Sequence, residues 1–163
     1  MKTAFLFSGQ GAQAIGMGKE LCENFPVADE VFNSASEALG FDIKDMVWNG
    51  DKDTLMITEN TQPAILTMSV AALRVAESLG LTPDVVAGLS LGEYCAITTA
   101  GGMELEDAIK MVWLRGNLMH NAVPEGKGGM AAVLGLSGEA VNEAIAYMEG
   151  VYVANYNCPG QIV

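Results

Sequence analysis

The feature that most constrains the fold is a five-residue turn, Gly88-Leu89-Ser90-Leu91-Gly92. Residues 85–87 before it are uniformly apolar, as expected for a strand that a parallel sheet buries on both faces. Residues 93–97 after it can continue directly as a helix. A serine between glycines at such a point is typical of a nucleophile elbow, where the serine takes strained backbone angles and small neighbours prevent clashes. The turn therefore predicts an α/β protein with the Ser90 hydroxyl at a helix N-terminus.

Ser90 is accordingly the candidate nucleophile. The backbone N–H of Leu91 and the dipole of the following helix can stabilise an oxyanion that develops beside the serine. An ordinary strand-to-helix turn is the alternative, because glycine and serine are common in turns. The apolar strand before the turn and the helix after it favour the catalytic interpretation.

Apolar spacing predicts further elements at residues 4–7, 27–39, 63–79 and 105–119. The first is expected to be a short buried strand, and the other three are expected to be amphipathic helices. Gly40 is placed to end the first of these helices, and Pro63 is expected at the first helical position of the second. Strands that alternate with helices indicate a layered α/β domain.

The sequence changes character after the glycine-rich stretch that begins at Pro124. Strands are expected at 130–134 and 151–154, with a helix between them that Ser137 caps. This pattern predicts two parts, residues 1–124 and residues 125–163, the second being the start of a small subdomain. The chain ends in what resembles an unfinished strand. An apolar edge at Ile162 and Val163 is therefore expected to favour self-association.

Charge and composition exclude several functions. The 163 residues carry a net charge of −12, which disfavours binding to nucleic acid. No apolar run reaches the roughly 18 residues that a membrane helix needs. The first residues hold too short an apolar stretch for a secretory signal. The three cysteines, Cys22, Cys95 and Cys158, are odd in number and far apart, which favours reduced thiols in the cytoplasm over disulfides or a metal site.

Five short motifs follow one another along the chain. They are Ser8-Gly9-Gln10-Gly11-Ala12-Gln13, Thr61-Gln62-Pro63-Ala64, Gly88-Leu89-Ser90-Leu91-Gly92-Glu93-Tyr94, Arg115-Gly116-Asn117-Leu118-Met119 and Asn157-Cys158-Pro159-Gly160-Gln161. In this order and spacing they resemble the malonyl-CoA:acyl-carrier-protein transacylases of fatty-acid synthesis and the acyltransferase domains of polyketide synthases. The resemblance covers the whole chain.

The resemblance implies an α/β-hydrolase-like large subdomain with an inserted ferredoxin-like small subdomain, of which this chain holds the N-terminal part. It implies that malonyl-CoA acylates Ser90 and that the phosphopantetheine thiol of holo-acyl carrier protein then takes the malonyl group. No metal or redox cofactor is implied. The family's oxyanion hole maps onto the backbone N–H groups of Gln10 and Leu91. Glycines on both sides of Gln10 suit a close approach of that backbone to a ligand.

The resemblance assigns Arg115 as the residue that binds the malonyl carboxylate, and it implies that Gln62 and Met119 line the acyl pocket. A guanidinium is a planar fork that can bind a carboxylate through two hydrogen bonds. The alternative for Arg115 is a surface ion pair with an acidic residue of its own helix. Those residues are Glu104, Glu106 and Asp107.

The general base is the element that the sequence does not supply. The family's base is a histidine downstream of the small subdomain, beyond Val163. His120 is the only histidine present, and its position in a last helical turn favours contacts with the helix C-terminus over catalysis. The chain by itself is therefore expected to be inactive. A thioesterase or esterase of the α/β-hydrolase type, or a non-catalytic fragment, are the alternatives.

Overall fold

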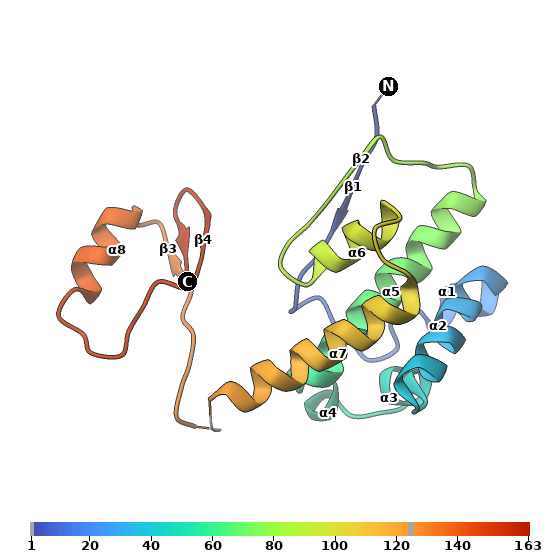
Figure 1. The fold of residues 1–163 in the computed structure, drawn as a ribbon, viewed down its shortest axis with the longest axis horizontal. Helices are drawn as coiled ribbons and strands as arrows, with labels where there is room; N and C mark the ends of the chain where they lie inside the picture. The colour runs from blue at the N-terminus through green and yellow to red at the C-terminus, as the bar shows by residue number, and fades with distance from the viewer. Residues whose placement is uncertain (1, 124–125) are drawn as a thin grey trace. The chain divides into compact units, whose positions relative to one another are not determined.

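The computed structural model describes residues 2–123 and 126–163 (Figure 1). The chain divides into two compact units, Met1–Ala122 and Val123–Val163. The predicted boundary between residues 124 and 125 lies outside the described residues. None of the helices within the described ranges is long and apolar enough to cross a bilayer.

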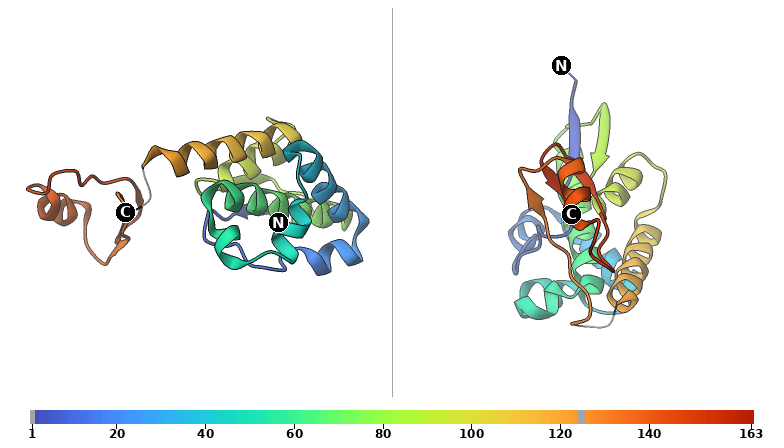
Figure 2. Two further views of the ribbon diagram at one scale, coloured as in Figure 1. Left: turned by 90° about the horizontal axis from the view of Figure 1, so that it is seen from below. Right: turned by 90° about the vertical axis from the view of Figure 1, so that its left-hand side faces the viewer.

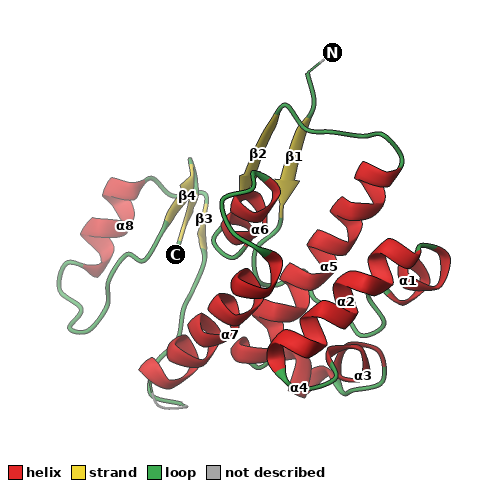
Figure 3. Ribbon diagram, turned by 45° about the vertical axis from the view of Figure 1, so that its right-hand side comes forward, coloured by secondary structure: helices red, strands yellow, loops and turns green. Residues whose placement is uncertain are grey.

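The larger unit contains a parallel pair of strands, β1 (Ala4–Phe7) and β2 (Val85–Gly88). Figure 3 shows the two strands side by side. Their register pairs Ala4 with Val85 and Phe7 with Gly88. Both strands were predicted from apolar runs, and both are confirmed. Their pairing brings the loop after β1 to the same end of the sheet as the turn that contains Ser90.

The expected burial of both strands is wrong. Residues on one face of the pair are exposed, among them Leu6 (79% exposed) and Val85 (60% exposed), while the alternate residues are half-buried. Successive side chains of a strand point to opposite faces of a sheet. In the described residues the sheet has two strands, and α6 (Gly92–Thr99) contacts both of them. The core therefore covers one face only.

Helices form the rest of the larger unit. Four of them come before the long central helix, namely α1 (Lys19–Asn24), α2 (Pro26–Leu39), α3 (Ile43–Trp48) and α4 (Lys52–Met56). Gly40 ends α2 in the left-handed conformation, as predicted, with φ 76°. Helices α2, α5 (Thr58–Ser78) and α7 (Leu105–Ala122) contact one another (Figure 2). Their facing apolar side chains make the core of this unit.

The predicted start of α5 is wrong. The helix begins at Thr58, and Pro63 lies inside it as a buried residue. The backbone carbonyl of Ile57 accepts hydrogen bonds of 2.8 Å from the N–H groups of both Asn60 and Thr61, which closes a helical turn upstream of the proline. Proline lacks an N–H, so the backbone carbonyl of Glu59, four positions earlier, receives no helical hydrogen bond from residue 63.

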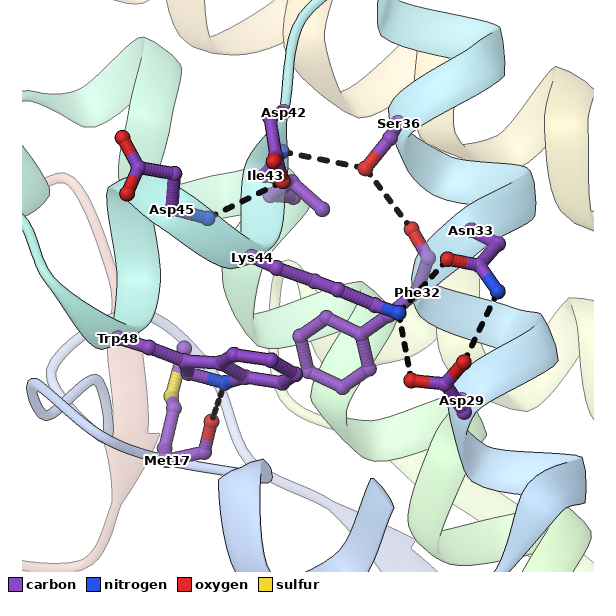
Figure 4. A network of polar contacts seen from close by, with 10 residues as sticks. All are labelled: Met17, Asp29, Phe32, Asn33, Ser36, Asp42, Ile43, Lys44, Asp45 and Trp48. Atoms are coloured by element: carbon purple, nitrogen blue, oxygen red, sulfur yellow. Dashed lines mark hydrogen bonds and ion pairs between the residues drawn. The ribbon is translucent and has the colours of Figure 1, made fainter. Parts of the chain in front are cut away.

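A network of polar contacts connects α3 to α2 (Figure 4). Lys44 Nζ donates to Asp29 Oδ1 over 2.5 Å and to Asn33 Oδ1 over 2.7 Å. The same ammonium lies 5.7 Å from the centre of the Trp48 ring. Trp48 Nε1 donates to the backbone carbonyl of Met17 over 3.0 Å, so the network also holds the loop before α1.

The smaller unit contains β3 (Val133–Leu134), α8 (Gly138–Ile145), β4 (Tyr156–Cys158) and β5 (Gln161–Ile162). Its three strands are antiparallel in the order β3-β5-β4. Ser137 caps α8 as predicted, since its Oγ accepts a hydrogen bond from the Ala140 N–H over 3.2 Å.

Three expectations for the smaller unit need correction. The strand expected at 130–134 covers only Val133–Leu134, and residues 151–154 form no strand. The last strand is not at an edge, because β5 pairs with a strand on each side and Ile162 is only 3% exposed. Hydrogen bonding of β5 on both sides removes the reason to expect self-association at Ile162 and Val163.

Candidate active site

Ser90 occupies a strained turn between β2 and α6. Among the described residues it is the one non-glycine residue with a positive φ, at 52°. A left-handed backbone costs a residue with a Cβ about 1–3 kcal/mol, so surrounding contacts must impose it. The next residue, Leu91, is fully buried and caps α6. The buried leucine anchors the turn, while the Ser90 side chain remains exposed.

The loop after β1 lies against this turn. The Leu89 N–H donates to the Phe7 carbonyl over 3.1 Å. A Cβ on Gly92 would lie 2.8 Å from the backbone oxygen of Ser8, too close for any side chain. Glycine at position 92 therefore allows the two backbones to touch, and this contact brings the loop that contains Gln10 beside the turn that contains Ser90.

Gln10 and Leu91 present backbone N–H groups from these two segments. Within the described parts of the chain, neither N–H donates a hydrogen bond to another protein group. The Gln10 side chain is held separately, since its Nε2 donates to Thr58 Oγ1 over 3.3 Å. Two N–H donors on contacting backbone segments have the chemistry needed to bind an oxyanion.

Arg115, on α7, contacts Ser90 directly. Its Nη2 donates to Ser90 Oγ over 3.1 Å, and its Nη1 donates to Gln62 Oε1 over 2.7 Å. Its guanidinium carbon lies 5.8 Å from the centre of the Tyr94 ring. The ion pairs found in the described residues are Lys44–Asp29 and Arg74–Glu77, so the alternative pairing of Arg115 with acids of its own helix is not observed.

Gln62 and Met119 complete the cluster. Gln62 is fully buried, and its Nε2 donates to Met119 Sδ over 3.3 Å. Hydrogen bonds thus connect Ser90, Arg115, Gln62 and Met119 in a row across the turn and two helices, α5 and α7. An arginine has five N–H donors, and two of those on Arg115 are used here, so it retains donors for an anion.

His120 is exposed in the last turn of α7. Among the described residues, the hydrogen bond to the Ser90 hydroxyl comes from Arg115, and His120 makes none with it. A guanidinium remains protonated in proteins and cannot accept the serine proton. The described residues therefore place a cation and no base at the hydroxyl.

Tyr94 is a site residue that the sequence interpretation missed. It lies in the first turn of α6, and the centre of its ring is 5.8 Å from the guanidinium carbon of Arg115. No spacing in the sequence indicated this contact, because Ser90 lies outside α6 and Arg115 comes from another helix.

The fold is of the mixed α/β class, with a parallel strand pair whose second strand leads through the turn at Ser90 into α6. The model of the acyl transferase domain family matches residues 4–163. A malonyl CoA-acyl carrier protein transacylase of Bacillus subtilis (strain 168) is 48% identical over 166 residues, which cover 99% of this chain and 52% of that protein.

Solved structures give the same result. A malonyl CoA-acyl carrier protein transacylase from Clostridium perfringens matches with a TM-score of 0.93 and 47% identity, covering 99% of this chain and 52% of that one. A malonyl-transacylase solved in complex with its type II PKS acyl-carrier protein matches with a TM-score of 0.92 and 42% identity, covering 99% and 54%. The chain belongs to the acyl transferase domain family. It spans about half the length of the curated relatives it matches.

Proposed function

We propose that the protein transfers a malonyl group from coenzyme A, through Ser90, to the phosphopantetheine thiol of acyl carrier protein. The observation that supports this most directly is the hydrogen bond from Arg115 to the Ser90 hydroxyl. It places a cation with unused donors beside the candidate nucleophile. A malonyl group carries a carboxylate a few ångströms from its reactive carbonyl. Arg115 suits the carboxylate, and Ser90 suits the carbonyl carbon.

The first half-reaction acylates the serine. The Ser90 oxygen bonds to the malonyl carbonyl carbon while its proton passes to a base, and the carbon–sulfur bond breaks so that coenzyme A leaves as a thiol. The N–H groups of Gln10 and Leu91 are proposed to bind the carbonyl oxygen as it becomes negative. We propose that the base comes from the part of the relatives' length that this chain does not span.

The second half-reaction reverses these steps with a different thiol. The phosphopantetheine sulfur bonds to the malonyl carbon, the ester bond to Ser90 breaks, and the serine regains its proton. Acyl carrier protein is proposed as the partner because the matched malonyl-transacylase was solved with one. We also propose an α/β-hydrolase-like large subdomain and a ferredoxin-like small one, with residues 1–124 and 125–163 as their N-terminal parts. The free thiols of Cys22, Cys95 and Cys158 suit a cytoplasmic site of action.

One experiment separates transfer from hydrolysis. The complete natural protein is mixed with malonyl-CoA, with and without holo-acyl carrier protein, and both free malonate and malonyl-carrier protein are followed by mass spectrometry. We expect malonyl-carrier protein to accumulate and malonate to remain near the level of an enzyme-free control. Malonate as the main product in both mixtures would favour a thioesterase and contradict the proposal.

A further inference from the structure

Helices α5 and α7 approach each other closely at Gly116, next to Arg115. A Cβ on Gly116 would lie 2.6 Å from the Cα of Glu59 and 2.8 Å from the backbone oxygen of Thr58. Real side chains do not tolerate such distances to backbone atoms, so glycine at this position sets how near the two helices lie. The α5–α7 contact at Gly116 therefore fixes the spacing of the helices but not their register.

The register has a separate determinant. Asn117 Nδ2, on α7, donates to Glu59 Oε2, on α5, over 2.8 Å. Both side chains are half-buried, and the acceptor is a carboxylate, which makes the hydrogen bond stronger than one between neutral groups. Among the hydrogen bonds of the described residues, neither side chain bonds to Ser90.

The same two helices also carry Gln62 and Arg115, which form a second polar contact between them at 2.7 Å. Gln62 makes a further contact with α7 through Met119. Gln62 follows Glu59 by three positions, so both lie on one face of α5. Arg115 and Asn117 flank Gly116. A slide of α7 along α5 would thus break the contact of Asn117 with Glu59 and that of Arg115 with Gln62 together.

We propose that Glu59 and Asn117 are positioning residues that fix the register of α7 on α5 and thereby direct the Arg115 guanidinium at Ser90. The inference deepens the proposed function and rests on it, because its consequence is selection of a carboxylate-bearing acyl group. A displacement of a binding group by about 1 Å can lower a rate by about 100-fold. Loss of the register contact therefore weakens use of malonyl groups more than use of acetyl groups, which have no carboxylate for Arg115 to bind.

The test compares Asn117→Ala, Glu59→Ala and Glu59→Gln in the complete natural protein. Glutamine keeps an oxygen that accepts from Asn117, so Glu59→Gln is the matched control. We expect the two alanine variants to lose about tenfold or more in kcat/KM for malonyl-CoA, from the loss of a charge-assisted hydrogen bond. Transfer of acetyl groups should change by less than about twofold, and Glu59→Gln should retain most malonyl activity.

A second readout does not depend on catalysis. Phenylglyoxal modifies accessible arginines, and peptide mass spectrometry gives the rate at Arg115. We expect Asn117→Ala to speed modification of Arg115 and to leave the rate at Arg74 unchanged. Equal losses of malonyl and acetyl transfer, or an unchanged rate at Arg115, would overturn the positioning role. A wild-type protein that never forms a malonyl adduct would overturn the proposed function, and faster modification of Arg115 would then still support the structural part.

Discussion

Arg115 donates a hydrogen bond of 3.1 Å to the Ser90 hydroxyl, although the two residues are 25 positions apart and come from different elements. The same guanidinium is held by Gln62 on a third element and lies against the Tyr94 ring. Two contacts of different kinds, a hydrogen bond and a cation–π contact, thus hold a cation beside the hydroxyl of the candidate nucleophile. This arrangement leads to predictions about both residues.

Replacement of Ser90 by alanine should abolish the covalent malonyl intermediate in the complete natural protein. The loss in transfer rate is expected to be about 10⁴-fold or more, because the Ser90 hydroxyl is the proposed attacking group. Intact-mass spectrometry after mixing with malonyl-CoA measures the adduct. A variant that still gains one malonyl group at another residue would show that Ser90 is not the nucleophile.

Replacement of Arg115 by alanine should reduce malonyl transfer far more than acetyl transfer. Loss of a hydrogen-bonded charge pair with one buried partner costs about 2–5 kcal/mol, and an acetyl group has no such pair to lose. Arg74→Ala is the control, because Arg74 pairs with Glu77 within α5. Equal losses for the two acyl groups would mean that Arg115 supports the fold and does not select the substrate.

His120→Ala should leave malonyl transfer unchanged in the complete natural protein. His120 is exposed, and the described residues show no hydrogen bond between it and Ser90. Steady-state rates at several pH values are the measurement. A loss of about 100-fold or more, the scale of general base catalysis, would identify His120 as the base.

The three thiols should differ in reactivity. Burial raises the pKa values of the Cys22 and Cys95 thiols to about 11, and an acidic neighbour, Asp29, contributes at Cys22. Only about 0.1% of such a thiol is ionised at pH 8, and the thiolate is the reactive form. Cys158 is exposed. A chromogenic disulfide reagent at pH 8 should therefore modify one thiol quickly, and Cys158→Ser should remove that fast phase.

The Lys44–Asp29 pair should make stability depend on pH at the acid end. The hydrogen bond from Lys44 is the largest cause that holds the pKa of the Asp29 carboxyl below its usual value of 3.8. A carboxyl with a lowered pKa in the folded state stabilises the fold above its unfolded pKa, and this contribution is lost as the pH falls through the folded pKa. The Asp29 side chain is 41% exposed, so solvent screens the pair.

Lys44→Met tests this expectation because methionine keeps most of the apolar stem beside Trp48. The free energy of unfolding, from urea titrations, should fall by about 1 kcal/mol or less at pH 7. At pH values below the folded pKa of Asp29 the variant and the wild type should converge. A constant difference between the two proteins across the whole pH range would show that packing of the stem, and not the charge, is responsible.

Local sequence predicted the features that depend on neighbouring residues. The strand before Ser90, the stop at Gly40 and the cap at Ser137 each follow from a few adjacent positions. The start of α5 was not predicted correctly. The helix begins before Pro63, where the backbone carbonyl of Ile57 accepts the first helical hydrogen bonds. In the smaller unit, apolar residues at 151–154 resembled a strand, yet the pairing partners of β5 come from elsewhere.

In the candidate site, too, features set by adjacent residues were predictable from the sequence and contacts between distant residues were not. Ser90 could be found from its turn, whereas the roles of Gln10, Arg115, Gln62 and Met119 came from the resemblance of motifs. Spacing along the chain could not show that Gln62 and Arg115, 53 positions apart, would bond to each other. That contact depends on how closely two helices pack, and the packing depends on a missing side chain at Gly116.

The positive φ of Ser90 has a consequence for how such a protein evolves. Glycine adopts this conformation without strain, so a serine-to-glycine change at the turn would relax the backbone while it removes the hydroxyl. Inactivation and greater thermal robustness would then arrive in a single mutational step. If Ser90 is the nucleophile, as proposed, selection for a more stable fold and selection for activity act against each other at this residue.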